Sequence, residues 1–80
     1  MGKRNKHREV RERMRLASNL RKIMRKAGVT QMQLSIYTET CPGAVCKWCQ
    51  GKSVPYSTTL KRIAQALGCT TDELLEGVWE

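Results

Sequence analysis

Three of the four cysteines lie close together in the sequence and are the residues best suited to metal or redox chemistry. They are Cys41, Cys46 and Cys49. Residues three apart on a helix share a face, so Cys46 and Cys49 could bind one Zn²⁺ ion or an iron–sulfur cluster, or form a redox pair. A closed zinc site needs four ligands, and neither a second Cys-x-x-Cys motif nor a nearby histidine is present. We therefore expect reduced thiols with packing or surface roles and no metal or cofactor, and we keep a metal or redox sensor as the alternative.

Residues with the spacing of a catalytic site are missing from the sequence. The single histidine, His7, lies in a basic stretch far from any candidate nucleophile. Gly51-Lys52-Ser53 resembles the end of a phosphate-binding loop, but the upstream glycine and the preceding strand that such a loop requires are absent. We expect neither enzymatic activity nor a small-molecule substrate.

The charge of the chain is concentrated at its N-terminal end. Residues 1–28 hold 11 of the 15 Lys and Arg against two acidic residues, whereas residues 29–80 hold four basic and five acidic ones. A positive field at one end attracts polyanions such as DNA, RNA or an anionic membrane surface, and a solubilising tail is the alternative interpretation. Because there is neither a signal peptide nor an apolar run of roughly 20 residues, we expect a cytoplasmic protein without a membrane partner.

The periodicity of apolar residues predicts an all-α fold of five helices. Residues 1–10 read as a flexible basic arm, and residues 11–80 read as one domain. Leu16, Leu20 and Ile23 follow a helical spacing, and Thr30 is a typical N-cap residue for the short helix that follows it. Thr70 with Glu73 three residues later is typical of a capping box. No strand pattern is present. The first four helices are expected at about residues 11–27, 31–38, 42–49 and 57–67, and the fifth is expected to follow Thr70 and to include Leu74 and Leu75.

The two short middle helices have the lengths and the tight connection of a helix-turn-helix, in which the first helix braces the second in the major groove of DNA. From Leu20 to about Gly77 the sequence resembles the lambda-repressor-like, Xre/Cro-type helix-turn-helix family. The segments that carry the resemblance are VTQMQL (29–34), VCKWCQGKSVP (45–55), TL (59–60), IAQALG (63–68) and DELL (72–75).

This resemblance implies a bacterial or phage regulator of transcription that binds double-stranded DNA, often as a homodimer. It also implies roles for individual residues. Thr30 and Gln31 would contact the DNA backbone from the start of the second helix. Lys52 and Ser53 would meet phosphates from the loop after the recognition helix, and the basic arm, with Lys3 and Arg4, would follow the backbone. The residues that would face the bases are Pro42, Gly43, Ala44 and Lys47.

The sequence departs from the family pattern at two places. Glu39 stands where the family turn usually has Gly, and a non-glycine residue in a left-handed conformation costs roughly 1 kcal/mol or more. In the base-facing set, Lys47 is the only side chain with a hydrogen-bonding group, which favours contact with thymine methyl groups or reading of DNA shape. The alternative functions are a protein-interaction module, either antitoxin-like or a docking domain, and RNA binding through the arm.

Overall fold

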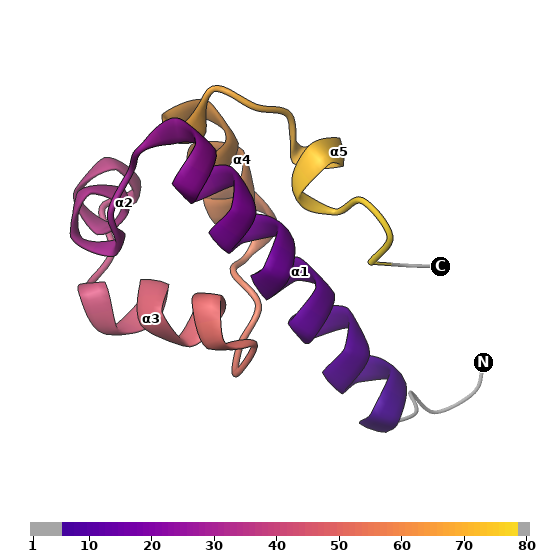
Figure 1. The fold of residues 1–80 in the computed structure, drawn as a ribbon. Coiled ribbons are helices and arrows are strands. Elements are labelled where there is room, and N and C mark those ends of the chain that lie inside the picture. Colours follow the sequence, from indigo (N-terminus) through magenta and orange to yellow (C-terminus); the bar gives the residue numbers. More distant parts are fainter. Residues whose placement is uncertain (1–5, 79–80) are drawn as a thin grey trace.

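The computed structural model describes the backbone of residues 6–78 and the side chains of residues 10–78. Every regular element in this part of the chain is a helix, so the predicted all-α class is confirmed. None of the helices described is both long and apolar enough to cross a membrane. Figure 1 shows the long α1 running diagonally, with α2 and α3 on one side of it, α4 behind it and α5 near the C-terminal end. The five helices are α1 (Lys6–Ala27), α2 (Gln31–Thr38), α3 (Pro42–Gln50), α4 (Ser57–Leu67) and α5 (Thr71–Leu74).

The first helix begins earlier than the sequence suggested. α1 starts at Lys6 rather than near Arg11, so residues 6–10 of the predicted flexible arm are helical. Residues 6–10 contain neither Gly nor Pro, and extending an existing helix costs far less than starting one, so nothing in this segment stops propagation toward the N-terminus. The remainder of the predicted arm, with Lys3 and Arg4, lies outside the described residues.

A single apolar core joins all five helices. Leu20 of α1, Leu34 of α2 and Ile63 of α4 are fully buried. Val45 and Trp48 point inward from α3, as their spacing of three residues predicted. Burial of aliphatic side chains contributes about 1.5–3 kcal/mol each, and this contribution makes short helices such as α2 and α3 stable.

The C-terminal end of the domain is tied to α1 by a polar contact. The Asn19 side chain donates both of its Nδ2 protons, one to the carbonyl of Leu74 and one to that of Glu76, each at 2.8 Å. The two acceptors lie at and beyond the end of α5, so one side chain on α1 fixes the last described segment of the chain against the body of the domain.

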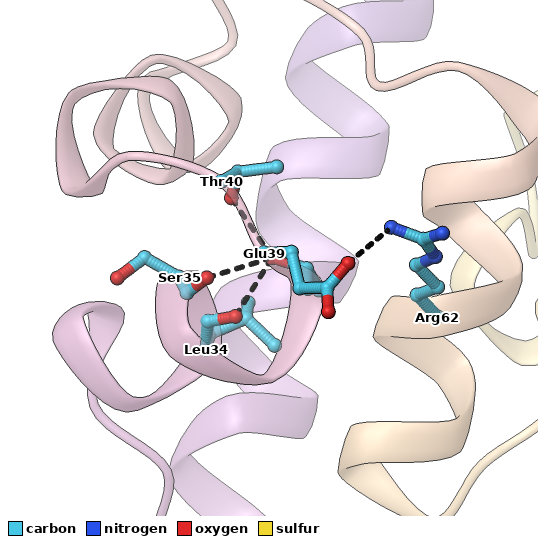
Figure 2. Close-up of polar contacts among 6 residues, drawn as sticks. Leu34, Ser35, Glu39, Thr40 and Arg62 are labelled. Carbon is cyan, nitrogen blue, oxygen red and sulfur yellow. Dashed lines mark hydrogen bonds and ion pairs between the residues drawn. The ribbon is translucent and has the colours of Figure 1, made fainter.

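The turn between α2 and α3 is held by hydroxyl groups and an ion pair (Figure 2). Thr38 is buried, and its Oγ1 donates to the carbonyl of Leu34 at 2.8 Å. The Thr40 hydroxyl lies 2.8 Å from Oγ1 of Thr38. Because the Thr38 proton is already donated to Leu34, Thr40 is the donor in this second hydrogen bond. Glu39 has φ 57° and ψ 39°, the predicted left-handed conformation, and its carboxylate lies 3.4 Å from Nη1 of Arg62 on α4.

Replacing Glu39 with glycine is expected to raise the free energy of unfolding by about 0.5–1 kcal/mol. Glycine removes the left-handed penalty of roughly 1–2 kcal/mol, and its greater freedom in the unfolded chain returns part of that gain. The lost ion pair matters little because both side chains are more than half exposed. Thermal unfolding measures the effect, with Arg62→Gln as the control that removes the ion pair alone. A Glu39→Gly protein less stable than the parent would contradict this account of the turn.

Candidate nucleic-acid interface

The exposed side of α3 is the centre of the candidate interface. One side of the helix is buried through Val45, Trp48 and Cys49, and α1 and α2 pack against it. Figure 1 shows α3 at the edge of the molecule, with its other side uncovered. Pro42, Gly43 and Lys47 are exposed there, and Ala44 is half-buried. The structure thus brings the four predicted base-facing residues together on one short helix.

The start of α2 carries a complete capping box. Thr30 Oγ1 accepts from the amide of Gln33 at 3.1 Å, and the Gln33 side chain accepts from the amide of Thr30 at 3.0 Å. A threonine hydroxyl that accepts in a cap still has its own proton to donate. Gln31, the first residue of the helix, is exposed. The N-terminus of α2 therefore presents a hydroxyl proton and an amide side chain beside a partial positive charge, which suits a phosphate group.

The loop after α3 differs from a simple phosphate-binding loop. Gly51 adopts φ 75°, and its amide donates to the carbonyl of Trp48. The amide of Lys52 donates to the carbonyl of Lys47 at 2.9 Å. Because both amides are used inside the protein, this part of the loop can contact phosphate only through side chains. Lys52 is exposed and Ser53 is half-buried, so the ammonium group is the stronger candidate.

Two further exposed residues, one at the end of α3 and one in the loop that follows it, were not singled out in the sequence. Gln50 ends α3, and its Nε2 donates to Sγ of Cys46 at 3.2 Å. Tyr56 precedes α4 and is 84% exposed, with a phenol that can donate to a phosphate. An aromatic residue in a polar loop was the available signal for Tyr56. For Gln50, the signal was its place seven residues after Gly43, which is two helical turns along the same face.

The cysteines of α3 lie in three different environments. Cys41 is exposed and Cys46 is half-buried, whereas Cys49 is buried with its Sγ 3.8 Å from Sδ of Met24. Burial raises the pKa of the Cys49 thiol above its ordinary value; Arg21 acts in the opposite direction, and Cys46 adds to the rise. Among the described residues, no three His, Cys, Asp or Glu side chains are grouped to hold a metal ion. The structure therefore offers Cys49 as a packing residue.

The four thiols should react with a maleimide or a disulfide reagent in a fixed order. Cys41 is expected to react first and Cys49 last, more slowly by about tenfold or more, because only a deprotonated and accessible thiol is a nucleophile. Mass spectrometry of digested protein after timed labelling measures each rate, and the guanidinium-unfolded chain, in which the rates converge, is the control. Equal rates for Cys41 and Cys49 in the folded protein would show that α3 does not pack as described.

The comparisons with known proteins agree with the all-α fold. The model of the Cro/C1-type HTH DNA-binding domain family matches residues 19–78. The crystal structure of the clp gene regulator ClgR from C. glutamicum is similar in fold, with a TM-score of 0.76 and 25% sequence identity. The superposition covers 84% of this chain and 87% of that one. None of the curated protein sequences compared with the chain matches it.

Proposed function

The chain belongs to the Cro/C1-type helix-turn-helix DNA-binding family, and from that premise we propose that it regulates transcription by binding double-stranded DNA in a sequence-dependent way. In this proposal α3 enters the major groove, the protein binds as a homodimer to paired half-sites, and it has no enzymatic activity. The single observation that carries the proposal is the uncovered face of α3, held by α1 and α2 through its opposite side.

The uncovered face offers a specific mode of reading bases. Lys47 can donate to O6 and N7 of a guanine, which are acceptors that only the major groove presents together. At Gly43 an added Cβ would meet no atom within 4 Å, so the surface there is open and the backbone can come close to the base pairs. The Ala44 methyl group can contact a thymine methyl group. Recognition of the base sequence would therefore combine hydrogen bonds from the charged Lys47 side chain with a close fit of Gly43 and Ala44 in the groove.

Residues on both sides of α3 would hold the phosphates. Thr30 and Gln31 lie at the start of α2, while Lys52 and Ser53 lie just beyond the end of α3. Contacts of this kind fix the register of a recognition helix without reading the sequence. The basic N-terminal segment, including Lys3 and Arg4 and continuing into the first turns of α1, would add counterion release and a steep dependence on salt.

Selection from a randomised duplex pool, under reducing conditions at near-physiological salt, tests the proposal. We expect a paired motif with half-sites about one helical turn apart. Lys47→Ala should then weaken binding to the selected duplex by about tenfold or more and leave binding to a scrambled duplex almost unchanged. Lys61→Ala, an exposed lysine on α4, is the matched control and should affect neither. Salt-sensitive binding without an enriched motif would mean that the protein holds DNA without reading it.

A further inference from the structure

Arg21 on α1 makes a contact that its place in the sequence did not suggest. Its position among exposed basic residues is typical of a solvated helix face, yet its Nη1 donates to the backbone carbonyl of Cys49 at 3.1 Å. The two residues are 28 positions apart in the chain. The acceptor lies in the last turn of α3, close to Lys47. The other residues proposed to face the bases, Pro42, Gly43 and Ala44, lie in the first turn, at the opposite end of that helix.

The contact supplies a donor to a third carbonyl at the end of α3. The last four carbonyls of a helix accept no hydrogen bond from amides of the same helix, so they need donors from elsewhere. Those of Lys47 and Trp48 accept from the amides of Lys52 and Gly51, whereas the carbonyl of Cys49 accepts from Arg21. A cation placed at the negative end of the helix dipole adds a favourable interaction. Arg21 thus caps α3 from a neighbouring helix.

The same end of α3 packs on α1. The Cys49 thiol is buried against Met24, and an added Cβ at Gly51 would lie 2.6 Å from Sδ of Met14. These contacts are apolar or steric and permit small rotations, whereas the hydrogen bond from Arg21 has a preferred direction. A nine-residue helix is about 13 Å long, so a tilt of about 10° at one end moves the other by about 2 Å. A shift of that size is larger than base readout tolerates.

We propose that Arg21 is a positioning residue for DNA recognition: it fixes the angle of α3 through the Cys49 carbonyl and raises sequence discrimination without touching DNA. The inference rests on the proposed function, because it assumes that α3 reads bases. Its alternative is that the Arg21 guanidinium contacts a phosphate directly. The two roles differ in their dependence on DNA sequence and salt.

The first test compares Arg21→Ala and Arg21→Lys with the control Lys22→Ala, which removes the same charge from an adjacent exposed position. Affinities are measured on the selected and a scrambled duplex over a salt series, below the unfolding temperature of each variant. A positioning role predicts that Arg21→Ala weakens binding to the selected duplex about tenfold and that Arg21→Lys restores part of this loss. On the scrambled duplex, Arg21→Ala and Lys22→Ala should have the same affinity and the same dependence of affinity on salt. The proposal would be overturned if Arg21→Ala lost the same affinity on both duplexes and if its plot of log affinity against log salt concentration were shallower by about one unit than that of Lys22→Ala.

The second test needs no DNA and so separates this inference from the proposed function. Cys49 should be labelled about five times faster in Arg21→Ala than in the parent or in Lys22→Ala, because the end of α3 separates from α1 more often. Loss of the Arg21 charge would by itself raise the pKa of Cys49 and slow its labelling. Faster labelling would therefore show that the end of α3 separates from α1 more often. Unchanged Cys49 labelling would overturn the positioning role. A parent protein without sequence preference would instead refute the proposed function.

Discussion

Replacing Gly51 with alanine is expected to lower the free energy of unfolding by about 2–4 kcal/mol, a large part of the total stability of an 80-residue domain. Two costs combine. A side chain at φ 75° in the left-handed region costs about 1–2 kcal/mol, and forcing a methyl group into a packed contact costs about 1–3 kcal/mol. The new Cβ would lie 3.3 Å from Cα of Met14, so rotation of the methionine side chain relieves only part of the clash.

Gly43→Ala is the matched control, because it makes the same change near the other end of α3. Gly43 has no positive φ, and an added Cβ would meet nothing within 4 Å. Alanine there should stabilise the protein by about 0.5–1 kcal/mol through helix propensity. Urea or guanidinium unfolding of both variants measures the two effects. If Gly51→Ala lowers and Gly43→Ala raises the free energy of unfolding, the result supports the close packing of the end of α3 against α1. A loss below about 1 kcal/mol for Gly51→Ala would contradict that packing.

Replacing Asn19 with alanine is expected to cost about 2 kcal/mol and to lower the midpoint of thermal unfolding by about 8–15 °C. The variant loses two hydrogen bonds to the backbone, each worth about 1 kcal/mol. It also leaves the part-buried carbonyl of Leu74 without its donor, while the exposed carbonyl of Glu76 can turn to water. The segment after α5 should become the first part of the domain to open on heating.

Ser18→Ala is the control for this prediction, since Ser18 is exposed and adjacent to Asn19 on the same helix. A surface substitution of this kind changes stability by less than about 0.5 kcal/mol. Hydrogen exchange of the amides of residues 74–78 locates the effect. If Asn19→Ala and Ser18→Ala melt within a few degrees of each other, the side-chain contact to the C-terminal segment does not contribute as described.

The features that depend on nearby residues were predictable from the sequence. The bounds of α2 and α4 agree with the expected residues 31–38 and 57–67, because the N-cap residue Thr30 and the spacing of Leu60, Ile63 and Leu67 act within one or two turns. The left-handed conformation of Glu39 was expected for a different reason, the resemblance to a family whose turn usually has Gly at this position.

Contacts between residues far apart in the chain could not be predicted, because a sequence pattern does not show which helices touch. Arg21 and Asn19 are polar residues on a helix with a basic exposed face, and only the folded arrangement shows that each holds a distant backbone carbonyl. The use of the Lys52 amide inside the protein is a second example, since it depends on how the chain leaves α3. The DNA-contacting roles of the predicted site residues remain predictions.

The central claim is that the exposed face of α3 lies in the major groove, and methylation interference on the selected duplex tests it most directly. Guanine N7 lies in the major groove and adenine N3 in the minor groove, so one alkylating reagent marks both. The account predicts that N7 methylation within each half-site blocks binding, and that Lys47→Ala removes the interference at one guanine of each half-site. Interference confined to minor-groove adenines would contradict it.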